Sequence, residues 1–161
     1  MIRSNLEINY GIYFTAGLPP KLHGVSNDLS KATSGGKVWN DKDDTFGNLP
    51  SFIDGGYVFQ TPARVYRDVV MIIVVYQPST IYVSSEAGGR SGGFGSSLPN
   101  DGWVLQEGTV HTSCCILSQI WKKIVTNKGM TTITLPVITT GEMVGSIFVK
   151  GNTSKFQNIP L

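Results

Sequence analysis

The segment Val69-Val70-Met71-Ile72-Ile73-Val74-Val75-Tyr76 is an uninterrupted apolar run, and it decides the fold class. The run is too short to cross a membrane, and its β-branched residues are stiff in a helix, so it predicts a buried β-strand. The polar residues 77–80 predict a turn, and Ile81-Tyr82-Val83 predicts a second strand. The sequence therefore predicts a hairpin at the centre of a two-layer β structure.

The composition supports an all-β domain. The chain has 161 residues, of which 40% are hydrophobic, 15% are charged and 19 are glycine. Few helix formers and many turn and strand formers favour strands, and this length suits one domain. We expect residues 1–161 to form a single two-sheet antiparallel β-sandwich of the jelly-roll type, with little helix.

Most other elements are predicted from alternation of apolar and polar residues. Residues 115–125 are the one helix candidate, but their β-branched and aromatic side chains favour a strand. Residues 21–36 are polar and rich in turn formers, and residues 86–101 are rich in glycine and serine, so both are predicted to be loops. The remaining strands are predicted at residues 6–14, 37–39, 57–60, 103–105, 109–112, 131–136 and 143–149.

Charge and hydropathy exclude two classes of partner. The net charge is +2 and no basic run of five residues occurs, which argues against nucleic-acid binding. No segment has the length of a transmembrane helix, so we expect no membrane insertion. The first residues lack an apolar segment, so no signal peptide is predicted in this chain.

Cys114 and Cys115 are neighbours in the sequence. In a strand they would point to opposite faces, and a disulfide between them would be strained. We therefore expect one buried thiol beside an exposed thiol, with an intermolecular disulfide as the alternative.

A series of short motifs is similar to one group of known modules. The series is Asp41-Lys42-Asp43-Asp44-Thr45-Phe46, Pro50, Gly56-Tyr57, Gln60-Thr61, Ile81-Tyr82-Val83, Arg90, Leu98-Pro99, Gly102-Trp103 and Trp121-Lys122. Over residues 36–151 the chain resembles accessory, carbohydrate-binding-like β-sandwich modules of secreted polysaccharide-degrading enzymes and related extracellular proteins. The resemblance implies a sandwich fold, a polysaccharide or glycan partner and an extracellular location. The chain departs from the pattern at Ser84-Ser85, where these modules have an acidic residue, and in its longer glycine loop.

Aromatic and arginine residues are the predicted ligand contacts. Apolar sugar faces stack on aromatic rings, so Trp39, Trp103 and Trp121, with Tyr57 and Tyr82, form a candidate sugar platform. In a β-sandwich most tryptophans pack in the core, and this is the competing interpretation of these side chains. In the glycine loop, Phe94 is the natural anchor and Arg90 its polar neighbour. The predicted ligand or partner contacts are Arg90, Phe94, Trp103 and Trp121.

Metal and catalytic signatures are weak. Asp41, Asp43 and Asp44 supply hard oxygen ligands of the kind that Ca²⁺ prefers, although carboxylates in such a turn more often accept backbone hydrogen bonds. No zinc-binding spacing exists. Residues 89–93 match G-x-S-x-G, and His23 or His111 with Asp101 offers a base and its orienting group. The motif lacks the strand and helix that the reaction requires, so we predict no enzyme activity and no cofactor other than calcium.

Two functions follow. The first is a non-catalytic, extracellular β-sandwich module that binds a polysaccharide or glycan. The alternative is a structural subunit that self-assembles into an extracellular filament, coat or matrix. The low charge and a mean hydropathy of +0.02 suit close packing of identical copies. Asn152-Thr153-Ser154 is a glycosylation sequon that matters only in a secreted eukaryotic chain.

Overall fold

The structure is a computed structural model that describes residues 2–4, 10–14, 29–61, 63–64, 71–75, 78–85, 98–129, 131–136, 143, 145–151 and 158–160. These ranges contain β-strands, turns and one short 3-10 helix, η2 (Leu98–Asp101), and no α-helix. The strands are β1 (Ile2–Ser4), β2 (Tyr10–Phe14), β3 (Leu29–Lys31), β4 (Tyr57–Phe59), β5 (Met71–Val75), β6 (Ser79–Ser85), β7 (Val104–Gln106), β8 (Val110–His111), β9 (Ile116–Leu117), β10 (Gln119–Val125), β11 (Thr131–Thr134), β12 (Ser146–Gly151) and β13 (Asn158–Pro160).

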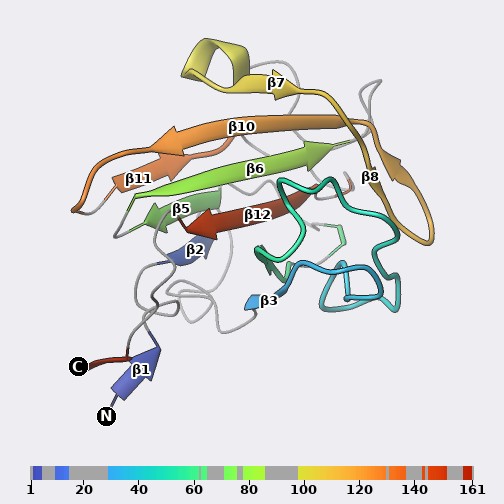
Figure 1. The fold of residues 1–161 in the computed structure, drawn as a ribbon, viewed down its shortest axis with the longest axis horizontal. Coiled ribbons are helices and arrows are strands. Elements are labelled where there is room, and N and C mark those ends of the chain that lie inside the picture. The colour runs from blue at the N-terminus through green and yellow to red at the C-terminus, as the bar shows by residue number, and fades with distance from the viewer. Residues whose placement is uncertain are drawn as a thin grey trace.

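Two antiparallel sheets build the fold (Figure 1). The large sheet has six strands in the order β3-β4-β12-β6-β10-β7, and the small sheet has three in the order β11-β5-β2. Two short pairs, β1 with β13 and β8 with β9, stand apart from these sheets. The predicted all-β sandwich is confirmed.

The predicted hairpin between the apolar run and the next strand is wrong. β5 lies in the small sheet and β6 lies in the large sheet. Both edges of β5 are occupied, by β2 and β11, and both edges of β6 are occupied, by β10 and β12. No edge remains through which the two strands could pair. The apolar run is nevertheless the middle strand of its sheet, as expected.

The inner core lies between the two sheets. Alternate residues of a strand point to opposite faces, and one set from each sheet meets here. The inner core consists of Phe59, Met71, Ile73, Ile81, Val83, Leu98, Trp103, Trp121, Val125, Ile133, Leu135, Ile147 and Val149. Each of these side chains is at most 8% exposed.

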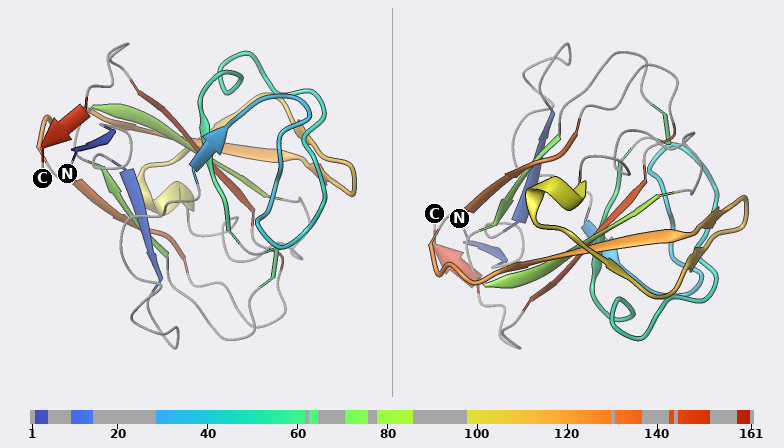
Figure 2. Two further views of the ribbon diagram at one scale, coloured as in Figure 1. Left: turned by 90° about the horizontal axis from the view of Figure 1, so that it is seen from below. Right: turned by 90° about the horizontal axis from the view of Figure 1, so that it is seen from above.

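The opposite face of the large sheet is also buried. In β12, Phe148 points away from its neighbours Ile147 and Val149 into this outer core. The covering residues come mainly from segment 32–63 and from the β8–β9 pair, and Figure 2 shows that segment away from β2 and β5. The outer core consists of Ala32, Val38, Trp39, Phe46, Ile53, Val58, Ala63, Tyr82, Val110, Leu117, Ile120, Met143 and Phe148. The large sheet is therefore a middle layer.

Local assignments differ from expectation in a few places. Residues 116–117 and 119–125 form strands β9 and β10, so the strand interpretation of the helix candidate is confirmed. β3 lies within the predicted loop 21–36, and η2 closes the predicted loop 86–101. Residues 37–39 form no strand, because Lys37 makes only an isolated bridge to Thr45. Of the predicted strand 6–14, β2 covers residues 10–14, and residues 6–9 lie outside the described ranges.

Two glycines are required by the backbone. A Cβ added at Gly56 would lie 2.8 Å from the carbonyl oxygen of Val149, so any side chain would force the chain away from β12. Gly102 has φ +84°, which is costly for residues with a side chain, and it turns the chain from η2 towards β7. Both glycines belong to the motifs that carry the family resemblance, and both have a structural reason.

Candidate functional site

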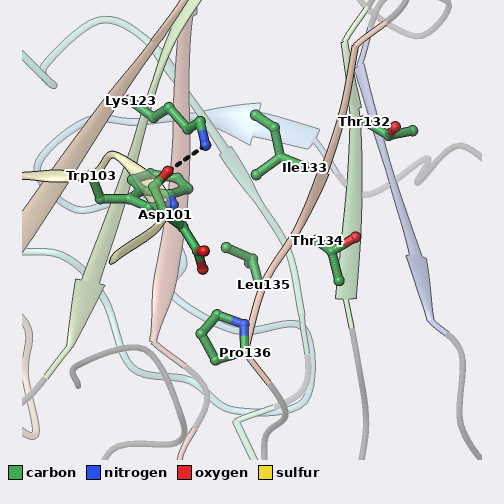
Figure 3. Close-up of a pocket in the computed structure, with 8 residues that line it drawn as sticks. All are labelled: Asp101, Trp103, Lys123, Thr132, Ile133, Thr134, Leu135 and Pro136. Atoms are coloured by element: carbon green, nitrogen blue, oxygen red, sulfur yellow. Dashed lines mark hydrogen bonds between the residues drawn. The ribbon is translucent and has the colours of Figure 1, made fainter. Parts of the chain in front are cut away.

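A groove of about 460 Å³ lies where the two sheets meet at one side of the sandwich (Figure 3). One wall comes from η2, from Trp103 just before β7, and from β10, and the other comes from β11 and the two residues after it. The lining residues are Asp101, Trp103, Lys123, Thr132, Ile133, Thr134, Leu135 and Pro136.

Lys123 supplies a cation to the first wall. It lies two residues after Trp121 in β10, so strand alternation turns it towards the small sheet, at the margin of the inner core. Its Nζ donates a hydrogen bond to the carbonyl oxygen of Asp101 at 2.8 Å and lies 5.7 Å from the centre of the Trp103 ring. Within the described part of the chain, no carboxylate pairs with this ammonium group.

Asp101 supplies an anion to the same wall. Its carbonyl is engaged by Lys123, whereas its carboxylate points into the groove in Figure 3 and accepts no hydrogen bond from a described residue. The first wall thus offers one donor group and one acceptor group of opposite charge beside the apolar ring of Trp103, and it faces the side chain of Leu135 on the second wall.

The second wall is the outer edge of β11. Ile133 and Leu135 are directed towards the first wall, and Thr132 and Thr134 are directed to the opposite side of the strand (Figure 3). Thr132 and Thr134 therefore line the groove through their backbone. The amide of Leu135 donates to the carbonyl oxygen of Met71 at 2.9 Å, so odd-numbered residues of this strand bond to β5. The N–H and C=O groups of Thr132 and Thr134 consequently point away from β5.

The sequence did not single out Lys123 or β11. The alternation in Trp121-Lys122-Lys123 is a signal that could have placed Lys123 on the inward face. No local pattern in the sequence predicts that the backbone N–H and C=O groups of Thr132 and Thr134 are open to a ligand. That depends on β11 being the outermost strand of its sheet, which is decided by the order of the strands.

The structure divides the predicted aromatic platform between two cores. Trp103 lines the groove but is only 4% exposed, and Trp121 is 8% exposed and does not line it. The indole N–H of Trp121 is buried and has no hydrogen-bond partner among the described residues. Trp39 and Tyr82 lie in the outer core, where burial raises the pKa of the Tyr82 phenol above its ordinary value. Tyr57 borders the inner core. These rings do not share one surface.

Several predicted residues lie outside the described ranges. They are Arg90 and Phe94, the G-x-S-x-G match at 89–93, His23 and Asn152. The roles assigned to Arg90 and Phe94 stay predictions. His111 is exposed on β8 and is not among the residues that line the groove with Asp101.

The acidic turn forms backbone and side-chain hydrogen bonds. One Asp41 oxygen accepts the amide N–H of Ala63 at 2.9 Å, and one Asp44 oxygen accepts the hydroxyl of Ser113 at 3.0 Å. Asp43 is exposed. Among the described residues, no group of three His, Cys, Asp or Glu side chains is placed to hold a metal ion. The arrangement supports the hydrogen-bonding interpretation of this turn.

We expect calcium to leave the stability of the protein unchanged. Two of the three carboxylates have partners on different segments, so gathering them around one ion would break those hydrogen bonds. Thermal melts in chelator and in millimolar CaCl₂ should have the same midpoint, because a ligand stabilises only the state that binds it. A midpoint that rises with calcium and falls again in an Asp43→Asn variant would instead establish a calcium site.

The two cysteines form a disulfide with each other, which corrects the expectation of separate thiols. They lie in the turn between β8 and β9 and not in a strand, so their side chains are not forced to opposite faces. The hydroxyl of Thr112 accepts the amide N–H of Cys115 at 3.0 Å, and the hydroxyl of Ser113 accepts the amide N–H of Thr45 at 3.1 Å. The turn is thereby joined to the acidic segment.

No protein-family model matches this chain, and no curated protein is similar to it in sequence. No helix in the described ranges is long and apolar enough to cross a membrane. Solved structures with a similar fold include two glycoside hydrolases. The structure of a β-glucuronidase from glycoside hydrolase family 2 matches 87% of this chain with a TM-score of 0.56 and 12% identity. A family 138 glycoside hydrolase that targets pectin rhamnogalacturonan II matches 94% with a TM-score of 0.54 and 15% identity. This chain spans 14% and 17% of those two chains, so its fold is similar to one portion of larger carbohydrate-active enzymes.

Proposed function

We propose that the protein is a non-catalytic β-sandwich module that binds a glycan in the groove between η2, β10 and β11. The observation that carries the proposal is the mixed lining of this groove. Lys123, Asp101 and the β11 backbone offer hydrogen-bonding groups around apolar atoms of Trp103, Leu135 and Pro136. Sugars need this combination, because their hydroxyls require partners and their C–H faces require apolar contact.

The non-catalytic part of the proposal follows from the carboxylates. Most glycoside hydrolases use two carboxyl groups on either side of the scissile bond. Asp101 is the one carboxylate among the described residues that line the groove. The two similar structures are glycoside hydrolases, and this chain corresponds to a small portion of each. That likeness suits an accessory role beside a catalytic domain.

We also propose that the module acts outside the cell. The disulfide between Cys114 and Cys115 supports this location, because disulfides persist mainly in oxidising compartments. A polysaccharide partner would be found in the same surroundings.

Lys123→Ala should weaken glycan binding by about ten- to a hundredfold, because a charge-assisted hydrogen bond contributes about 1.5–3 kcal/mol. Affinity electrophoresis against cellulose-type, chitin-type, xylan and pectin polymers would identify a ligand, and titration calorimetry would give the Kd. The matched control is Lys150→Ala, because the Lys150 ammonium also donates to an aspartate carbonyl, that of Asp54 at 3.3 Å, away from the groove. If Lys123→Ala and Lys150→Ala bound the glycan equally well, with unchanged thermal midpoints, the groove would not be the glycan site.

A further inference from the structure

The free edge of β11 gives the groove a property that goes beyond a general sugar site. β11 is the outermost strand of the small sheet, and no strand of the described chain pairs with its other side. Thr132 and Thr134 therefore present backbone N–H donors and C=O acceptors to the groove at alternating positions. Such an edge normally recruits another backbone, since its groups are arranged to bond to amides.

The opposite wall repeats this combination of donor and acceptor. The Lys123 ammonium has further N–H donors beyond the one engaged by Asp101, and the Asp101 carboxylate is an acceptor. A group that donates in one direction and accepts in the other would satisfy both walls. A trans secondary amide has this geometry, because its N–H and C=O point in opposite directions.

Electrostatics favours a neutral group over a charged one. A carboxylate in the groove would be attracted by Lys123 and repelled by Asp101. The Coulomb energy of a pair of unit charges has the same magnitude for like and unlike signs at the same distance. At similar distances the attraction to Lys123 and the repulsion from Asp101 therefore largely cancel. A neutral amide uses both side chains without such opposition, and an acetyl methyl can contact the apolar atoms of Leu135, Pro136 and Trp103.

We infer that the glycan carries N-acetylated amino sugars, and that the acetamido group spans the groove from the β11 edge to Lys123 and Asp101. The inference rests on the proposed glycan-binding function. It assigns the specificity to a backbone edge, in which Thr132 and Thr134 contribute main-chain groups and not their hydroxyls.

Three β-1,4-linked tetrasaccharides that differ at the C2 substituent test the ligand class: chitotetraose, its fully deacetylated form and cellotetraose. Calorimetry should give a Kd for chitotetraose at least tenfold lower than for the other two. Equal binding of cellotetraose and chitotetraose would overturn the inference and leave the proposed function standing. If none of the three binds while a polymer of the wider panel does, the inference alone fails. If nothing in that panel binds, the proposed function fails with it.

Thr134→Pro tests the edge itself. Proline removes the N–H that faces the groove but no hydrogen bond to β5, and an edge strand tolerates it there. The affinity for chitotetraose should fall about tenfold, to that for cellotetraose. Thr134→Val, which keeps the N–H and removes the hydroxyl, should bind like the parent. If Thr134→Pro and Thr134→Val bind chitotetraose with equal affinity and have the thermal midpoint of the parent, the backbone edge of β11 does not contact the ligand.

A second measurement covers the case in which Thr134→Pro fails to fold. In the parent protein labelled with ¹⁵N-threonine, chitotetraose should shift the amide resonances of Thr132 and Thr134, and cellotetraose should leave them in place. Unmoved resonances at saturation would overturn the inference. An acetylated and amidated tetravaline that binds more tightly than chitotetraose would also overturn it, because the edge would then be a peptide-docking strand.

Discussion

Ile73→Asp is expected to leave the protein unfolded. Ile73 is fully buried in β5, the middle strand of the small sheet, and it pairs with Ile12 on one side and Ile133 on the other. An unpaired carboxylate in this position would lose its hydration without gaining a partner, and the isoleucine contacts with the inner core would also be lost. The combined cost of several kcal/mol is comparable with the total stability of a domain, about 5–15 kcal/mol.

Circular dichroism and the thermal midpoint would measure this effect. Ile73→Val is the matched control, because it keeps an apolar β-branched side chain and should cost about 0.5–1.5 kcal/mol. If Ile73→Asp were soluble and melted at the parent's temperature, β5 could not be part of a core, and the assignment of the apolar run as the central strand would be wrong.

Phe148→Ala is expected to destabilise the protein by about 3–5 kcal/mol, the usual cost of removing a buried aromatic ring. Phe148 is 1% exposed in β12, lies opposite Tyr82 and Val58 on the neighbouring strands, and packs 5.6 Å from the Phe46 ring between centroids. Its removal would open a cavity between the large sheet and segment 32–63. Urea denaturation monitored by fluorescence would give the change in the free energy of unfolding.

Phe52→Ala is the control for this measurement. The Phe52 ring lies 5.2 Å from the Tyr82 ring between centroids, but Phe52 is only partly buried at the margin of the outer core. Its removal should cost clearly less than that of Phe148. If Phe148→Ala cost as little as a typical surface substitution, within about 0.5 kcal/mol, the covering segment would be a loosely attached loop, and the large sheet would have one core and not two.

The strands were largely predictable because alternation is a local property of the sequence. Residues 57–59, 104–106, 110–111, 119–125 and 131–134 are strands close to where the pattern placed them. The sheet to which each strand belongs was not predictable. The error at β5 and β6 arose because the free edges of a strand are decided by partners far away in the chain, such as β2 and β12.

The candidate site was less accessible to sequence reasoning for the same reason. The motifs behind the family resemblance mark structural positions in part, as Gly56 against β12 and the fully buried Leu98 illustrate. Trp103, a predicted contact, lines the groove with nearly all of its surface buried, and its contact with a ligand stays a prediction. The edge of β11 can be identified only once the order of the strands is known. The disulfide can be identified only once the turn between β8 and β9 places Cys114 and Cys115 outside a strand.

The position of β12 in the large sheet has a consequence for synthesis on the ribosome. β12 consists of residues 146–151 and is translated long after β4 and β6. In the large sheet it nevertheless lies between these two strands. Until β12 emerges, those two strands have no neighbour on the sides that it will occupy, and the inner and outer cores lack Ile147, Phe148 and Val149. The nascent chain therefore cannot complete its middle layer strand by strand. Closure depends on pairing segments that are far apart in the sequence, a slow step during which open strand edges must be kept from other chains.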